Sequence, residues 1–254
     1  ARIAAAHEAG KVVLLDVVEE IEGGVLTDAH QGDLDPSELP ADEAKRVRES
    51  AERLNRVADR LRTRVGVPCE VVVATGDPVT TTLDTAGRAN CDLIVTPYEE
   101  QQGALSPYVR AVLGGPTDAL AHRSTGERRW RRVLVPVSRP GDSAHAMVDF
   151  ATRLAGRSGG VSACTCIGRE VERRGAERQL ANIVEAFDAP IETRVARAEV
   201  TEFIQENADT YDLVMLGSSG DRSAASRLIS PPTFERLRDV DCDVAVVDTG
   251  SANR

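Results

Sequence analysis

The sequence is poor in aromatic residues, in lysine and in long apolar runs. Aromatic side chains make up 3% of the 254 residues, so a buried core has to be aliphatic. No apolar stretch approaches the roughly 18 to 20 residues that span a bilayer. Lys11 and Lys45 are the only lysines, and the formal net charge is -10. This balance excludes a general nucleic-acid-binding role, which needs a surplus of clustered cations.

The usual signatures of metal and catalytic sites are also missing. None of the five cysteines forms a Cys-x-x-Cys pair, and no histidine lies at metal-ligand spacing. We therefore expect reduced thiols and no metal site. No strand-to-helix Gly-x-Ser-x-Gly elbow occurs, and His145 is not spaced from Asp142 and Ser143 as a triad requires. The sequence predicts no catalytic residues and a protein that is not an enzyme.

Arginine takes the place of lysine in this acidic chain. Such a composition fits a salt-rich cytoplasm, and it fits equally a genome rich in G and C. No signal peptide is recognised, so a cytoplasmic location is expected. The first ten residues resemble the last turns of a helix that ends at Gly10, from which we expect a longer segment upstream.

Two stretches of the chain repeat the same order of elements. Residues 91–97 and residues 211–217 are apolar strands with Asp-Leu at their second and third positions, and each precedes a polar, glycine-containing loop and a short helix. The breakers Gly114-Gly115-Pro116-Thr117 and Ser230-Pro231-Pro232-Thr233 follow these helices. Repetition of this kind predicts a duplicated domain, with one copy over 1–127 and the other over 128–254.

The second copy predicts a complete doubly wound domain. Apolar strand-like runs alternate with helical stripes of apolar residues, which is typical of a parallel sheet covered on both faces. The expected strands are 132–137, 161–167, 191–195, 211–217 and 244–247.

The first copy looks incomplete at both ends. It supplies the same parts from Val12 onward, but no strand precedes Ala1 and no apolar run lies between Leu120 and Arg132. We expect the first and last strands to be missing, and residues upstream of Ala1 to supply the internal one. An acidic loop over about 22–42 is longer than ordinary connections, and is either mobile or a surface for a partner.

The chain resembles a tandem member of the universal stress protein family. The resemblance rests on the Val-Leu-Val-Pro-Val strand at 133–137, on the order of elements, and on the loop Gly217-Ser218-Ser219-Gly220. It implies two flavodoxin-like (Rossmann-like) α/β domains with doubly wound parallel sheets, the first incomplete at its N-terminus. Many members bind ATP through a Gly-x2-Gly-x9-Gly-Ser/Thr motif after the fourth strand. The residues that match this site here are Ser138, Gly217, Ser218, Ser219, Gly220 and Ser230.

The matching site departs from the motif. Ser230 and Pro231 stand where the motif has Gly-Ser, and proline has no N–H to offer a phosphate. Asp221 follows Gly220, and Ser138 replaces the family's aspartate at the end of the first strand. In the first copy Pro97 replaces the first glycine. We therefore predict no cofactor, with ATP or AMP bound to the second domain as the alternative.

The resemblance implies a non-catalytic module for stress response or regulation. Such modules also occur as the cytosolic tail of membrane transporters, so a transporter or another protein is the expected partner. A nucleotide-sensing switch that uses the second domain's glycine-rich loop is the alternative. The basic cluster 128–132 has two interpretations: it grips a phosphate, an acidic lipid or a partner's carboxylate, or it is a solvated linker with Trp130 packed at the domain junction.

The strand Val244, Ala245, Val246 and Val247 predicts how the domains assemble. In this family paired domains meet through their last strands, so the two copies should form a pseudo-two-fold pair. Because no last strand is recognised in the first copy, the edge of this strand needs another cover. The sequence therefore predicts a homodimer joined at these four residues.

Overall fold

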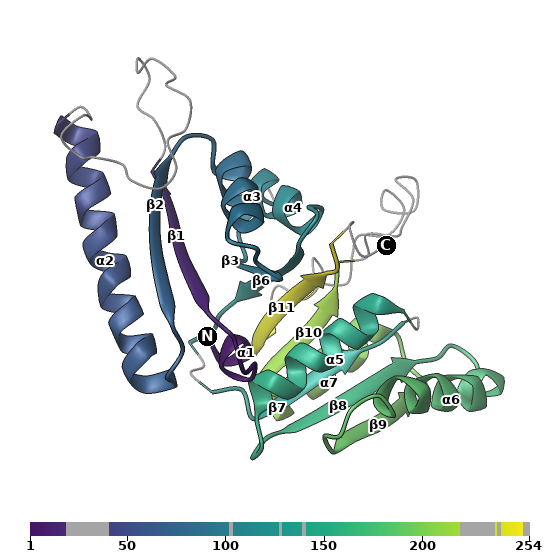
Figure 1. Cartoon of the computed structure of the whole chain (residues 1–254). Coiled ribbons are helices and arrows are strands. Elements are labelled where there is room, and N and C mark those ends of the chain that lie inside the picture. The colour runs from purple at the N-terminus through teal and green to yellow at the C-terminus, as the bar shows by residue number, and fades with distance from the viewer. Residues whose placement is uncertain are drawn as a thin grey trace. The chain divides into compact units, whose positions relative to one another are not determined.

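The computed structural model describes residues 1–18, 41–101, 104–126, 129–138, 141–218, 237 and 240–250, without the side chain of Asp142 (Figure 1). The chain divides into two compact units, Ala1–Asp92 and Leu93–Arg254. Each unit is described below by itself.

The first unit is a two-stranded parallel sheet with helices. Its elements are α1 (Arg2–Ala5), β1 (Val12–Val18), α2 (Ala41–Val65), β2 (Cys69–Thr75) and α3 (Pro78–Arg88). β1 runs parallel to β2, and α2 packs against both strands. Asp77 begins α3, because its carboxylate accepts the N–H of Thr80 at 2.8 Å and Pro78 occupies the first helical turn.

Burial in this unit is shallow. Every residue of β1 except Val18 keeps partial exposure, and the buried apolar side chains are valine and alanine. Asp16, in the middle of β1, accepts hydrogen bonds from Ser50 and from Arg53 of α2. The strand is therefore tied to its helix by polar contacts as well as by packing.

The second unit is built on a seven-stranded sheet in the order β3-β6-β11-β10-β7-β8-β9. Its strands are β3 (Leu93–Pro97), β6 (Asp118–Arg123), β7 (Arg132–Pro136), β8 (Gly160–Cys166), β9 (Ile191–Ala196), β10 (Leu213–Gly217) and β11 (Asp243–Asp248). A small hairpin of β4 (Glu100–Gln101) and β5 (Ala104–Leu105) stands apart from this sheet. All neighbouring strands of the large sheet are parallel except β6 and β11.

Helices cover both faces of this sheet, as the alternating pattern predicts. They are α4 (Pro107–Leu113), α5 (Asp142–Ala155), α6 (Arg173–Val184) and α7 (Val200–Asn207), with the short 3-10 helices η1 (Glu170–Glu172) and η2 (Ala208–Thr210). In the second copy α5 and α6 lie on one face of the sheet and α7 lies on the other (Figure 1). The largest fully buried side chains of the described residues all belong to this unit, among them Leu134, Leu180, Ile183 and Met215.

The last strands of the two copies meet in the middle of the large sheet. β6 and β11 are antiparallel, with Val246 opposite Ala121 at the centre of the pairing. β3 flanks β6 just as β10 flanks β11, each parallel to its neighbour. The four strands are thus related by a local pseudo-two-fold axis, so the prediction that the copies meet through their last strands is confirmed.

Two predictions for this region are wrong. The first copy does have a last strand, β6, although its apolar run is only Ala119 to Ala121. Consequently the edge of Val244 to Val247 is not open: β10 pairs with one side of β11 and β6 with the other. The strand has no free edge through which a homodimer could form.

That the first copy lacks its opening strand, and that residues upstream of Ala1 supply it, stays a prediction. In the second copy, β7 lies between β10 and β8. Within the part of the chain that the structure describes, β1 pairs only with β2, and β3 pairs only with β6. The repeat boundary at 127 and 128 also stays a prediction, and the acidic loop over 22–42 lies almost wholly outside the described residues.

No helix in the described ranges is long and apolar enough to cross a membrane.

Candidate functional site

The site predicted from the sequence lies at the carboxyl ends of β7 and β10. The chain runs outward from β7 to β8 and β9, then returns to β10 and β11 on the other side. The order therefore reverses between β7 and β10, which is where open α/β sheets bind ligands. Ser138 follows β7 and is exposed, and Gly217 ends β10. The fold thus brings these two residues to one edge of the sheet, whereas Ser219, Gly220 and Ser230 lie outside the described residues.

The described part of this crevice is filled by its own hydrogen bonds. The N–H of Ser218 donates to the carbonyl of Val247 at 2.8 Å, and its hydroxyl donates to the carboxylate of Asp248. Asp248 is 6% exposed. Beside it, Ser143 and Thr249 join their hydroxyls at 3.0 Å. Ser143 does not cap α5, because the helix begins at Asp142 with Gly141 at the N-cap position, which places Ser143 inside the first turn.

These residues fit a nucleotide phosphate poorly. A phosphate cradle needs backbone N–H groups that point at the anion, and the N–H of Ser218 is used inside the sheet. The buried carboxyl group of Asp248 occupies the place beside it and accepts the hydroxyl of Ser218. Close packing does not require a glycine at position 217 either, since a Cβ there would lie 3.8 Å from the nearest atom, on Met147. The described geometry shows a crevice bonded to itself.

The first copy repeats this corner with different side chains. The N–H of Tyr98 donates to the carbonyl of His122 at 2.8 Å, the counterpart of the bond from Ser218 to Val247. Pro97 therefore stands in the position of Gly217, as the sequence comparison of the two copies indicates. The Tyr98 hydroxyl donates to Glu100 at 3.1 Å, so a carboxylate lies at this corner as Asp248 does at the corner of the second copy.

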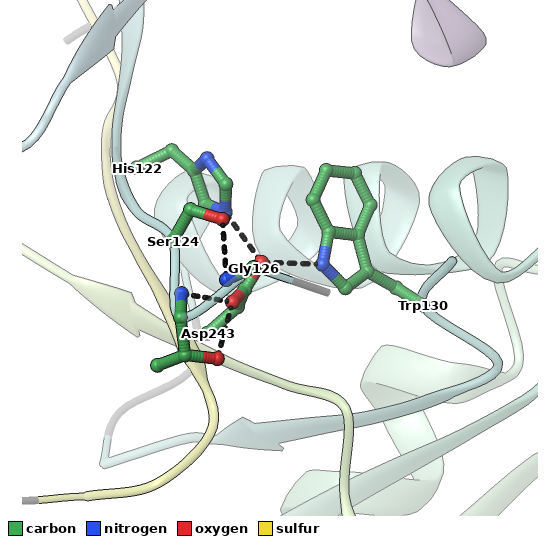
Figure 2. Close-up of polar contacts among 6 residues, drawn as sticks. His122, Ser124, Gly126, Trp130 and Asp243 are labelled. Atoms are coloured by element: carbon green, nitrogen blue, oxygen red, sulfur yellow. Dashed lines mark hydrogen bonds and ion pairs between the residues drawn. The ribbon is translucent and has the colours of Figure 1, made fainter. Parts of the chain in front are cut away.

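A second polar cluster, which the sequence did not predict as a site, surrounds Asp243 at the start of β11 (Figure 2). Asp243 is 0% exposed. Its Oδ1 accepts the N–H of Thr125 at 2.7 Å and the hydroxyl of Thr125 at 2.9 Å. Its Oδ2 accepts Nε1–H of Trp130 at 2.8 Å and lies 2.9 Å from Nε2 of His122. The rings of His122 and Trp130 meet edge to face, 5.1 Å apart.

These bonds decide the ionisation of Asp243. Burial by itself raises the pKa of a carboxyl, because it disfavours the charged form. The donors from Thr125, Trp130 and His122 outweigh burial and leave the pKa of Asp243 below its ordinary value. The carboxylate is therefore charged near neutral pH, and each of these donors comes from β6 or from the segment that follows it.

The junction of the two copies is closed by further contacts across the local axis. Arg123, at the end of β6, donates to the carbonyls of Leu237 and Val240 at 2.8 and 3.1 Å. At the opposite end of the strand pair, the N–H of Gly250 donates to Asp118 at 2.9 Å. A Cβ on Gly250 would come 2.0 Å from the carbonyl oxygen of Pro116, so only glycine fits there.

The sequence held a signal for this junction. Asp118-Ala119-Leu120-Ala121 and Asp243-Val244-Ala245-Val246 share an opening aspartate and a short apolar run. The contacts of Trp130 confirm that its ring packs at the junction, whereas the two interpretations of the arginines in 128–132 stay predictions. Within the described ranges, no group of three or more side chains could hold a metal ion.

Fold and junction together define a class of protein: a tandem α/β module with flavodoxin-like sheets joined through their last strands. Residues 1–126 match the model of the universal stress protein family. The chain belongs to the universal stress protein family.

Solved structures share this fold over nearly the whole chain. A universal stress protein from Archaeoglobus fulgidus is 16% identical, with a TM-score of 0.63, covering 98% of this chain and 91% of that one. The cytoplasmic domain of a prokaryotic cation chloride cotransporter is 11% identical, with a TM-score of 0.60, covering 96% of this chain and 98% of that one. At these identities the likeness shows the fold alone. No curated protein matches the chain.

Proposed function

We propose that this chain is a non-catalytic regulatory module that acts by binding another protein, and that it serves as the cytosolic regulatory part of a membrane transporter. The observation that carries the proposal is the state of the crevice between β7 and β10. There Ser218 bonds to Asp248, and Ser143 bonds to Thr249. In the part of this crevice that the structure describes, the N–H and hydroxyl of Ser218 and the hydroxyls of Ser143 and Thr249 are already bonded to the protein itself, which favours recognition through the outer surface of the module.

The transporter part of the proposal is supported by the length of the structural match. The cotransporter cytoplasmic domain and this chain cover one another almost completely, so the fold is alike over nearly the whole length of both. The sheet is continuous through β6 and β11, so the last strands of the two copies are joined by backbone hydrogen bonds, which suits a regulatory tail.

Titration calorimetry with ATP and with AMP tests the ligand-free state of the crevice. We expect no binding heat with either nucleotide and no release of phosphate from ATP. The matched variant is Asp248→Ala, which removes the carboxylate from the crevice. A dissociation constant in the micromolar range for the wild type would overturn the proposal, and hydrolysis would overturn its non-catalytic part.

A nucleotide-sensing switch is the second candidate. One arrangement favours it: Ser138 is exposed at the end of β7, next to the end of β10 where Gly217 lies. If nucleotide heat is observed, Gly217→Val distinguishes binding in this crevice from binding elsewhere. A Cβ at Gly217 makes only ordinary contact with Met147, so the fold tolerates the change while the branched side chain obstructs the crevice.

A further inference from the structure

Three arginines of the linker between the copies are held outward on a fixed backbone. Arg129, Arg131 and Arg132 are exposed. Among the described residues, none of their guanidinium groups forms a hydrogen bond or an ion pair. In a chain with a net charge of -10, three cations within four consecutive residues concentrate positive charge on this segment.

The backbone that carries these arginines is bonded on both sides. Trp130 is anchored to Asp243 through Nε1–H. The N–H groups of Arg131 and Arg132 donate to one carboxylate oxygen of Asp212, at 2.7 and 2.8 Å. The carbonyl of Arg131 accepts the N–H of Gly160 at 2.7 Å. The cations are therefore positioned before any partner arrives, which lowers the entropy that binding costs.

A cleft of about 530 Å³ adjoins the linker at the amino ends of β7, β8 and β9. In the strand register Arg132 lies beside Gly160 and Ser162 lies beside Glu192, so these four side-chain positions share the face covered by α7. Arg132, Ser162, Glu192, Thr210 and Tyr211 give the cleft its polar lining. Its volume lies in the range of ordinary ligand sites.

The polar lining runs from positive to negative across the cleft. Arg132 stands at the linker end, and Glu192 stands two strands away, where it accepts the hydroxyl of Ser162 at 2.8 Å. The Tyr211 hydroxyl accepts from Arg194 at 3.2 Å. A ligand that follows this polarity carries its acids near the arginines and neutral, hydrogen-bonding groups near Glu192.

We propose that the three linker arginines and this cleft form a docking site for an acidic peptide segment of a partner protein. The acids of the peptide pair with Arg129, Arg131 and Arg132, and the neutral part of the peptide extends into the cleft toward Glu192. Charge complementarity selects a peptide that is acidic at one end. A flat anionic lipid surface would use the arginines but leave the cleft empty. This inference rests on the proposed regulatory role in one respect, namely that the peptide belongs to a partner protein. The nucleotide titration tests that role separately from peptide binding.

Fluorescence anisotropy on the full chain tests the site. The probe is a fluorescein-labelled peptide of three glutamates followed by Gly-Ser-Gly-Ser, compared with the same peptide carrying glutamines. We expect saturable binding of the acidic peptide only, weakening as salt rises. The triple variant Arg129→Gln, Arg131→Gln and Arg132→Gln should bind at least about tenfold more weakly.

A matched triple variant controls for net charge. Arg60→Gln, Arg64→Gln and Arg174→Gln remove three other exposed arginines, on α2 and α6, and should leave the affinity unchanged. Gly160→Leu tests the cleft itself. A Cβ at Gly160 meets nothing within 4 Å, so the side chain fills the cleft without straining β8, and binding should again fall about tenfold.

Three results would overturn the proposal. They are no binding of the acidic peptide by the wild type, equal losses in the two arginine triples, and unchanged affinity in Gly160→Leu. Vesicles containing anionic lipid form the last arm. Capture of the chain by vesicles, without peptide binding, would assign the arginines to a membrane instead. The fluorescence of Trp130, the only tryptophan, reports whether each variant keeps its junction.

Discussion

Asp118 and Asp243 begin the last strand of each copy, yet the two carboxylates have different surroundings. Asp118 is half-buried and accepts the N–H of Gly250, just past the end of the partner strand. Asp243 is fully buried, and it accepts the equivalent backbone N–H from Thr125 together with side-chain donors from Thr125, Trp130 and His122. The repeat thus retains one backbone bond at both ends, and at the end near the linker the side chains of Thr125, Trp130 and His122 also bond to the aspartate.

The strands that flank β11 and β6 also differ: a side chain of β10 is more deeply buried than its counterpart in β3. Met215, in β10, is completely buried on a sheet that α5 covers. Val95, in the equivalent strand β3, is 60% exposed. Since burial of an apolar side chain contributes about 1.5–3 kcal/mol, Met215 should contribute more to stability than Val95, its counterpart in β3.

The largest expected difference is between the two aspartates. Asp243→Ala removes the buried acceptor of four donor groups, from Thr125, Trp130 and His122, so it should lower the free energy of unfolding by about 3–5 kcal/mol. Asp118→Ala should cost about 1 kcal/mol, because the carboxylate is half-buried. Urea denaturation followed by circular dichroism measures both. Equal losses would mean that the side-chain cluster adds nothing to the backbone bond.

The second comparison uses the apolar strand positions. Met215→Ala should lower the free energy of unfolding by about 2–5 kcal/mol, because it opens a cavity in a closed core. Val95→Ala should change it by less than about 0.5 kcal/mol, as expected at an exposed position. A loss of several kcal/mol at Val95 in the same urea titration would show that this side chain is buried in solution.

The third comparison concerns two glycines at the ends of neighbouring strands. Gly250→Ala forces a Cβ to within 2.0 Å of the Pro116 carbonyl, and should cost about 1–3 kcal/mol through backbone displacement. Gly217→Ala makes only an ordinary 3.8 Å contact with Met147 and should be nearly neutral. Thermal unfolding of the two variants checks this, and a melting temperature for Gly250→Ala equal to that of the wild type would refute the close approach.

A smaller effect is expected from pH. Because the pKa of Asp243 is lowered in the folded state, the unfolded chain binds the proton more tightly. The stabilisation is fully present above the ordinary aspartate pKa of about 3.9, and is lost as pH falls through the lower, folded value. Asp243→Asn should remove this part of the acid dependence in urea titrations between neutral and acid pH. If wild type and variant lose stability in parallel, another carboxylate is responsible.

The sequence predicted the fold well because the fold depends on local patterns. Alternating apolar strands and striped helices fixed the α/β class and all five strands of the second copy. β6 was missed because its apolar run is three residues long and its end is occupied by His122 and Arg123. Its pairing with β11 depends on residues more than a hundred positions apart, which no local pattern encodes.

The candidate site was predicted only where topology decides it. Ser138 and Gly217 could be assigned to one edge of the sheet, because parallel strands end together. Two features could not be predicted from spacing: the bond between Ser218 and Asp248, and the gathering of His122, Thr125 and Trp130 around Asp243. Each requires the register of β11 against its two neighbours, and that register exists only in the folded sheet.

The most direct test of whether the cluster around Asp243 stabilises the junction of the two copies and holds the linker in place is the coupling free energy between Asp243 and Trp130. A double-mutant cycle of Asp243→Asn and Trp130→Phe, read by urea denaturation with circular dichroism, isolates it. The buried charge-assisted hydrogen bond between Trp130 and the carboxylate predicts a coupling of about 1–3 kcal/mol. Additive effects, with a coupling below about 0.5 kcal/mol, would contradict the account.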